Sequence, residues 1–400
     1  MTDQALDARH TIALRETTLG EWCARRGLPY MQIAAGRPGK VQLRSLPGIT
    51  PGTVLKLEQP EVFCGLVEGA WVLPDCRFPF TTDGYLILRG FTLVDSTAFA
   101  DLKPYLQGKG EDGQIAITIP GKAVPVEQAC VFIGGLSNFG HFILESVLRL
   151  MALNSLPDAQ LLPIAVFDDL PARYLEFLDL LGFTSERRIM VPRNALLRFS
   201  RVWFLSSPVS RAEVTSPARM SAPAVWALRT STAYLSRPMG APRPRFYLGR
   251  SNVTWRRVVN EAAVQALLAR FSVMPLELSH LSAEEQISIV SNAEMLVTVV
   301  GAASQIVFFS APDCATIELS PSQMPATYGP AAVAAIFDQP YARLVCRIAT
   351  AEDSLAAGLP PNPSQQYYDQ DIVVDLAGLE TLLAAADKWC RRAEAGGLPA

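Results

Sequence analysis

Strands alternate with helices in the second half of the sequence, and this alternation constrains the fold more than any other feature. Four short apolar runs are separated by helical segments between residues 245 and 319. Apolar runs of this length between helices are typical of the buried strands of a parallel sheet. The expected strands are Arg245–Leu248, Ser272–Leu276, Met295–Val300 and Ala315–Leu319. We therefore predict a doubly wound α/β domain in this half.

The intervening helices carry recognisable start signals. Asn260 is placed to cap a helix whose apolar side chains recur at helical spacing through Phe271. Ser282 and Glu285 form the pattern of a capping box, in which each side chain satisfies a free N–H group of the other. A third helical segment, Ala302–Phe309, follows directly on a glycine that ends a strand.

The same rhythm begins earlier, near residue 128. Cys130–Ile133 reads as a strand, Asn138 as a cap, and Phe139–Asn154 as a helix. The preceding residues read as short β segments broken by Gly and Pro. We predict a β-rich extension (1–127), a first Rossmann-like domain with a crossing segment (128–240), a second Rossmann-like domain (241–350), and a C-terminal segment with a helix packing back on the first domain (351–400).

Composition excludes several classes of protein. With 400 residues, 50% of them hydrophobic, the chain can bury two cores. A net charge of −3 gives no sign of a nucleic-acid partner, which needs a basic face. Three histidines and seven scattered cysteines favour neither a metal site nor a disulfide framework. The sequence shows no signal peptide and no membrane span. We expect a cytoplasmic protein without a metal, for which peripheral membrane contact stays open.

Two loops that follow strands suit an anionic ligand. The loop from Gly249 to Asn260 carries Arg250, Arg256 and Arg257 beside a predicted helix start, where arginine forks and free N–H groups favour phosphate. The alternative is a solvated arginine cluster paired with acids such as Glu261. The second loop is the small-residue turn Gly301-Ala302-Ala303-Ser304, which lets a ligand approach the backbone, although a plain strand–helix turn is the commoner reading.

Two further features carry candidate carboxylates. His141 and Glu145 lie four residues apart on one helix face, opposite the apolar stripe, where they are candidates for general-base work. The alternative is an exposed helical pair. Glu318, near the end of a strand, can hold ribose hydroxyls or act as a capping acid. Asp369-Gln370-Asp371 matches a metal–nucleotide motif of another fold, and its place in a polar loop favours chance.

Taken together, these motifs resemble glycosyltransferase family 61, whose members make capsules, lipopolysaccharides and eukaryotic glycans. Their order and spacing match from about residue 130 to residue 320. The matching residues are Asn138-Phe139-Gly140-His141-Phe142, Glu145, Arg250, Arg256-Arg257, Asn260-Glu261, Glu285-Gln286, Gly301-Ala302 and Ile317-Glu318-Leu319.

The resemblance implies a GT-B fold, in which two Rossmann-like domains face each other across a cleft. It also implies an inverting, metal-independent glycosyltransferase with a nucleotide-sugar donor as substrate and no further cofactor. The acceptor is a glycan or a lipid-linked hydroxyl compound, with Asn138, Gly140, His141 and Glu145 on its side and one of the last two as base. The diphosphate contacts are Arg250, Arg256, Arg257 and Asn260; Gln286, Gly301, Ala302 and Ser304 line the nucleotide pocket, and Glu318 holds the ribose.

One departure from the family pattern keeps alternatives open. Val300 and Ala303 stand where the family usually has His and Gly. A non-catalytic nucleotide-sugar or glycan-binding protein, derived from such an enzyme, is therefore the second hypothesis. A third is an unrelated α/β protein that binds another anion, such as a phosphorylated metabolite, in the arginine loop.

Overall fold

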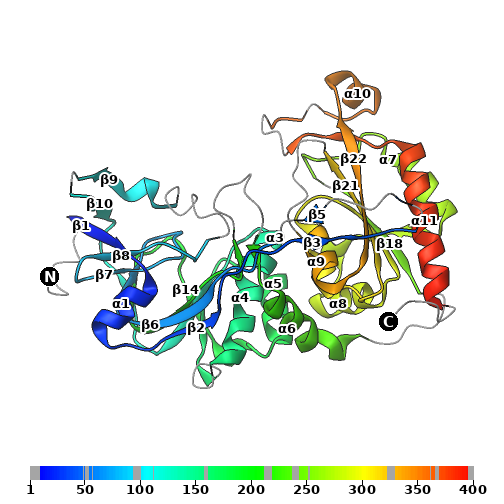
Figure 1. Ribbon diagram of the computed structural model, residues 1–400. Helices are drawn as coiled ribbons and strands as arrows, with labels where there is room; N and C mark the ends of the chain where they lie inside the picture. The colour runs from blue at the N-terminus through cyan, green and yellow to red at the C-terminus, as the bar shows by residue number, and fades with distance from the viewer. Residues whose placement is uncertain are drawn as a thin grey trace. The chain divides into compact units, whose positions relative to one another are not determined.

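A computed structural model describes residues 10–47, 49, 54–55, 57–92, 101–110, 112–156, 161–210, 219–236, 243–250, 253–321, 329–360, 362–364 and 369–394. The chain forms two compact units (Figure 1). The first comprises residues 1–39 and 58–227, and the second comprises residues 40–57 and 228–400. The mixed α/β class expected from the sequence is confirmed, with a large sheet in each unit.

The parallel part of the first unit follows the strand order of a Rossmann half. β12 (Cys130–Gly134), β13 (Ile164–Phe167), β14 (Arg188–Val191) and β15 (Leu197–Leu205) lie in the order β14-β13-β12-β15. β13 and β15 flank β12 on opposite sides, so the strand order reverses at β12. The topological switch point therefore lies between β12 and β15. Ligands in such sheets bind beyond the carboxyl ends of the strands at this point.

The β-rich N-terminal residues extend this sheet. β6 (Val62–Val72) pairs antiparallel with β15 and also with β2 (Tyr30–Ala34). The order then continues through β7 (Phe80–Thr81), β8 (Tyr85–Ile87), β1 (His10–Thr17), β10 (Ile115–Ile119) and β9 (Leu106–Lys109), while β11 (Val124–Val126) pairs with β15. α1 (Leu19–Arg26), which the sequence reading did not predict, is fixed by a Thr18–Glu21 capping box.

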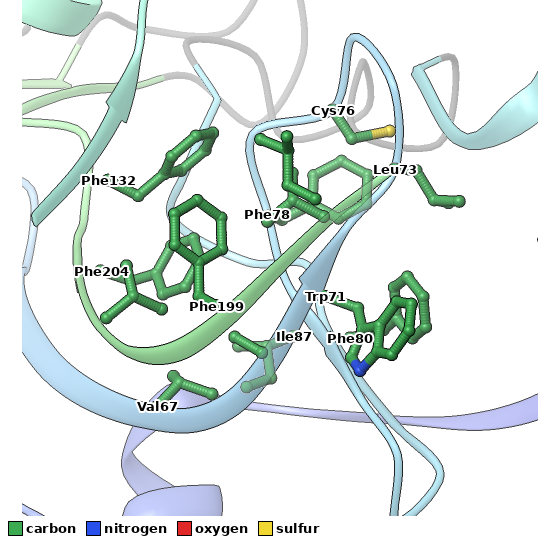
Figure 2. Close-up of a cluster of buried hydrophobic side chains, with 14 of the residues drawn as sticks. Val67, Trp71, Leu73, Cys76, Phe78, Phe80, Ile87, Phe132, Phe199 and Phe204 are labelled. Carbon is green, nitrogen blue, oxygen red and sulfur yellow. The ribbon is translucent and has the colours of Figure 1, made fainter. Parts of the chain in front are cut away.

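Aromatic side chains form the core of the first unit. Figure 2 shows Phe132 of β12 beside Phe199 and Phe204 of β15. Its ring centroid lies 5.4 Å from that of Phe199, 5.6 Å from that of Phe204 and 5.9 Å from that of Phe167. Burial of each such side chain stabilises the fold by roughly 1.5–3 kcal/mol. This core fixes the ends of β12 and β15, from which the site loops begin.

The second unit is doubly wound, as predicted. Its sheet has the order β19 (Val273–Pro275), β18 (Arg245–Leu248), β20 (Met295–Val299), β21 (Ala315–Pro321), β22 (Pro340–Ile348) and β23 (Ile372–Val373). All four predicted strands are present. The switch point lies between β18 and β20, because β19 flanks β18 on the other side.

Helices cover both faces of this second sheet (Figure 1). α7 (Glu261–Arg270) packs with α11 (Leu376–Glu394) on one face, and α8 (Ala283–Asn292), the 3-10 helix Ala303–Phe309 and α9 (Pro330–Phe337) lie on the other. The Ser282–Glu285 capping box is confirmed. The prediction has α11 packing back on the first domain, but its apolar stripe is covered by its own unit, in a core with α7, β21 and β22. In the described part of the chain, no helix is both long and apolar enough to cross a membrane.

An N-terminal segment crosses into the second unit. β4 (Arg44–Ser45) pairs parallel with β22, and β3 (Val41–Gln42) pairs with β5 (Val54–Leu55). The Arg44 guanidinium also lies 5.6 Å from the ring centroid of Trp389 on α11. The predicted extension 1–127 thus contributes residues to both units. β3 and β5 are two of the short β segments expected in this extension.

Candidate functional site

A first candidate site begins where β12 ends, in the first unit. Gly134 and Gly135 both have positive φ values, 67° and 111°, and turn the chain out of the sheet. The Asn138 side chain then accepts a hydrogen bond of 3.2 Å from the backbone N–H of His141, so the predicted cap is confirmed. Gly140 is buried in this first turn, α3 (Phe139–His141). His141 therefore lies at the carboxyl end of β12, beside the switch point of the first unit.

The helix that follows does not keep α-helical geometry. Phe142–Val147 is a π-helical turn, followed by α4 (Leu148–Leu150) and a 3-10 turn, Met151–Ser155. The prediction that His141 and Glu145 share a face opposite the apolar stripe is wrong for Glu145, which is only 2% exposed, and the alternative of an exposed helical pair fails for the same reason. A π turn widens the helix and rotates the later side chains, so that Glu145 turns inward. Such turns are frequent at functional sites.

Glu145 is held by partners on both carboxylate oxygens. Arg77, from the segment after β6, donates to Oε2, and the Nδ1 atom of His141 lies 2.7 Å from Oε1. Burial alone raises the pKa of Glu145, but the Arg77 charge and the His141 hydrogen bond hold that pKa below its ordinary value. A charged carboxylate only accepts hydrogen bonds, so Nδ1 carries the proton.

Two more ionic groups, one buried and one half-buried, surround this pair. Arg149, also buried, donates a hydrogen bond of 2.6 Å to the backbone oxygen of Phe91, and burial together with the charge of Arg77 lowers its pKa to about 10. Asp101 lies 3.4 Å from Arg77, and burial raises the pKa of Asp101. Two arginines thus balance two carboxylates beneath His141.

This arrangement gives the exposed imidazole a defined role. The His141 side chain is 48% exposed, while its Glu145 partner is buried. With Nδ1–H bonded to the carboxylate, Nε2 is the basic atom of the neutral ring. A carboxylate behind an imidazole fixes its tautomer and stabilises the imidazolium form. The geometry therefore suits His141 as a general base and Glu145 as its positioning residue.

A second candidate site lies at the switch point of the second unit. Arg250 follows β18, and Gly301 follows β20, its parallel neighbour. The Arg250 guanidinium lies directly against Gly301, where a Cβ atom would overlap with it. The two loops singled out in the sequence therefore meet at one edge of this sheet, where Arg250 packs on Gly301.

Positive charge is concentrated at this edge. Burial and the neighbouring charge of Arg256 lower the pKa of Arg250 to about 10. Its hydrogen bonds, of 3.3 and 3.4 Å, go to the backbone oxygen of Trp255, and among the described residues no carboxylate forms an ion pair with it. Arg256 has a positive φ of 56°, a strained conformation for a side chain of this type, and donates to the backbone oxygen of Val300. Such a site gains from a bound anion.

Two other residues predicted here are engaged in structural contacts. The Arg257 guanidinium donates at 3.0 Å to Asp371 through Nε and at 2.7 Å to the backbone oxygen of Pro360, and it is only 7% exposed. The Asn260 side chain exchanges two hydrogen bonds of 2.9 Å with the backbone of Val374, so it does not cap α7 through its side chain as predicted. Both residues tie the β18 loop to the segment around β23.

The polar side chains among the remaining predicted residues are also hydrogen-bonded within the protein. Gln286 donates to the backbone oxygens of Leu278 and Leu281, and the Ser304 hydroxyl donates to the backbone oxygen of Gly301. Ala302, beside Gly301, is partly exposed. Glu318 lies inside β21 rather than at its end; it is buried and accepts a hydrogen bond from the Tyr341 hydroxyl. Burial raises the pKa of Glu318.

The Asp369-Gln370-Asp371 motif holds arginines. Asp371 pairs with Arg257, and an Asp369 carboxylate oxygen lies 3.7 Å from Nε of Arg256. Within the described ranges, no three or more His, Cys, Asp or Glu side chains gather as metal ligands would. The carboxylates of this motif therefore hold the arginine loop, which does not conflict with the prediction that the match to a metal–nucleotide motif is chance.

Comparison with known families finds one family that the middle of the chain resembles. Residues 139–317 match the model of the family Glycosyltransferase 61. The resemblance to glycosyltransferase family 61 is confirmed. No curated protein matches the chain. The family segment supports glycosyltransferase activity with sugar-donor and acceptor substrates. It contains His141, Glu145, Arg250 and Gly301, and it ends one residue before Glu318.

Several residues around the family segment escaped the sequence reading. Arg77 and Asp101 come from 68 and 44 residues before Glu145 along the chain, and no local pattern connects them. Arg149, four residues after Glu145, was within reach of a helical-spacing argument. Asp371 lies in the Asp369-Gln370-Asp371 motif, whose match to a metal–nucleotide motif is predicted to be chance. For Arg149, the available signal was a charged residue among the apolar residues of a helix expected to be buried.

Proposed function

We propose that this protein is an inverting glycosyltransferase that transfers a sugar from a nucleotide-sugar donor to a hydroxyl group of a glycan or lipid-linked acceptor. The observation that carries the proposal is the exposed His141 ring, held through Nδ1 by the buried Glu145 carboxylate at 2.7 Å, at the start of the family segment. The two Rossmann-type sheet orders support a GT-B enzyme, and the absence of a disulfide among the seven buried cysteines agrees with a cytoplasmic setting.

The reaction proceeds in one displacement. The acceptor oxygen attacks the anomeric carbon, the bond from that carbon to the diphosphate oxygen breaks, and the acceptor proton passes to Nε2 of His141. Glu145 stabilises the imidazolium that forms. The departing diphosphate gains negative charge, which the Arg250 guanidinium and the strained Arg256 are suited to stabilise. We propose that this occurs without a divalent metal, in the synthesis of a bacterial surface polysaccharide.

Of the arginines that the resemblance assigns to the diphosphate, we favour Arg250. Arg257 is engaged with Asp371, whereas the hydrogen bonds of Arg250 go to the backbone oxygen of Trp255. The assignment predicts that Arg250→Ala weakens binding of UDP or GDP at least tenfold in isothermal titration with EDTA present. Arg347→Ala, which removes an arginine that is 55% exposed in the same unit, serves as the control and should bind as the unaltered protein does. Full affinity in Arg250→Ala would overturn the assignment.

A second candidate function is binding of a nucleotide sugar without transfer. The observation that favours it is Val300, an apolar residue at the β20 end where the family usually has a histidine, and whose backbone oxygen accepts from Arg256. This candidate predicts nucleotide binding that Arg250→Ala weakens, together with no consumption of any nucleotide sugar in the presence of acceptors. Steady release of nucleoside diphosphate would exclude it.

A further inference from the structure

A cavity of about 380 Å³ opens in the first unit, away from the residues assigned above. This volume lies within the range of ligand sites, roughly 300–1,000 Å³. Its walls come from α1, β2, the start of β6 with the two residues before it, and the segments after β8 and β15. Ser207 and Ser210 follow the carboxyl end of β15, the parallel neighbour of β12. Because β12 leads to His141, the cavity lies at the same edge of the same sheet.

An aromatic platform forms one wall. Tyr30 is 38% exposed, and its ring centroid lies 5.9 Å from that of Phe63 at an angle of 33°. The ring packs over Gly20 in α1, where a Cβ atom would come within 3.2 Å of it. Gly20 is the second residue of α1, and its missing side chain leaves room for this ring. An exposed, fixed aromatic face is a surface on which the C–H face of a sugar ring packs.

Charged groups of both signs surround the platform. Arg89 and Arg219 line the cavity together with Glu61. Each arginine has one carboxylate neighbour at 3.1 Å, Glu16 for Arg89 and Glu58 for Arg219, and an arginine has five N–H donors. An anionic ligand would meet the Glu61 carboxylate and two guanidinium groups that are each already paired with a carboxylate. Neighbouring sugar hydroxyls both donate and accept, and they match this mixture of signs.

The cavity is connected to the His141 network by a short stretch of chain. Gly90 lines the cavity, and the next residue, Phe91, accepts the hydrogen bond of Arg149 beneath Glu145. Phe91 also packs edge-on against Phe63 at 6.1 Å between ring centroids. Phe91 thus contacts both the cavity wall, through Phe63, and Arg149, which lies beneath Glu145 and His141.

From this geometry we propose that the Tyr30 cavity binds a neutral sugar unit of a glycan. The inference rests on the proposed transferase function in one respect, namely that the bound sugar belongs to the acceptor. The acceptor is then a glycan chain held at a second point, beyond the hydroxyl that reacts at His141. Affinity for the chain should depend on Tyr30 and Arg89, and not on His141.

Native electrophoresis through gels containing a neutral glucan, mannan or galactan tests this directly. We expect at least one of these polymers to retard the full-length protein, with the apparent affinity falling at least tenfold in Tyr30→Ala and in Arg89→Ala. Tyr30→Phe keeps the ring and should bind nearly normally, which separates stacking from misfolding. Arg201→Ala removes a comparable arginine, 60% exposed and paired with Glu68 in the same unit, and should leave the retardation unchanged.

Three results would overturn the proposal. The first is no retardation by any neutral polymer, and the second is retardation of Tyr30→Ala and Arg89→Ala equal to that of the unaltered protein. The third is retardation only in a polyanionic gel such as polygalacturonate. His141→Ala keeps the test independent of catalysis, because it should bind the polymer as the unaltered protein does. Polymer binding without any sugar transfer would support this site and contradict the proposed function. Sugar transfer without polymer binding would support the proposed function and contradict this site.

Discussion

Glu145 is a buried carboxylate that keeps its charge because Arg77 and His141 contact its two oxygens. Breaking a buried ion pair leaves the partner charge without compensation, at a cost of about 3–5 kcal/mol. The sequence placed Glu145 in the correct turn and beside His141, but it could not supply Arg77, since the two residues meet only through the tertiary fold. The consequence is that Glu145 supports both stability and the proposed base.

The acid dependence of stability follows from this pair. The pKa of Glu145 is lowered by folding, so its stabilising contribution is present above its ordinary value of 4.5 and is lost as the pH falls through the lower folded value. Denaturation followed at pH 7 and below pH 4.5 should show a smaller acid-induced loss in Glu145→Gln than in the unaltered protein. Glu127→Gln, at a residue that is 68% exposed, should behave like the unaltered protein. Identical acid losses in all three would refute the account.

Arg257 separates a structural role from a ligand role. In the structure it binds Asp371 and the Pro360 backbone, whereas the family resemblance assigns it to the diphosphate. We expect Arg257→Ala to lower the free energy of unfolding by about 3–5 kcal/mol, since Asp371 stays buried without its partner. Arg347→Ala, an exposed ion pair with Asp353, should cost no more than about 1 kcal/mol. Unchanged stability in Arg257→Ala with loss of nucleotide binding would restore the role that the sequence suggested.

At the scale of elements, the regular pieces were predictable and the irregular turn was not. β18 begins and ends as predicted, and the Ser282–Glu285 box starts α8, because local periodicity and capping chemistry determine both. The π turn Phe142–Val147 breaks the 3.6-residue period on which the prediction depended. Helical spacing therefore located the His141–Glu145 pair correctly but gave the wrong exposure for Glu145.

The contact between α1 and β6 offers a test of how the cavity wall is held. Gly65 of β6 lies so close to α1 that a Cβ atom would come within 2.9 Å of Cys23 Sγ and of Leu19 Cγ. Overpacking of this kind costs about 1–3 kcal/mol, so Gly65→Ala should destabilise the protein by that amount in urea denaturation. Gly108→Ala in β9, where a Cβ atom meets nothing within 4 Å, is the matched control and should change stability by less than about 0.5 kcal/mol. A neutral Gly65→Ala would mean that α1 is free to shift.

At the scale of the whole molecule, the chain passes between its two units more often than a linear reading suggests. Residues 40–57 lie in the second unit, while the segments on both sides of them lie in the first. The sequence indicated two α/β regions because each has its own strand–helix rhythm. It could not indicate that two-residue strands such as β4 pair with β22, since so short a strand has no periodicity. The proposed base and the proposed diphosphate arginine belong to different units.

The central claim is that His141 is the base of a sugar transfer, and the release of nucleoside diphosphate from a panel of nucleotide sugars, with glycan acceptors present, tests it most directly. We predict turnover by the unaltered protein and a rate lower by about 10²–10⁴-fold in His141→Ala, with nucleotide affinity unchanged. Turnover by His141→Ala at the unaltered rate, or no consumption of any nucleotide sugar by the unaltered protein, would contradict the account.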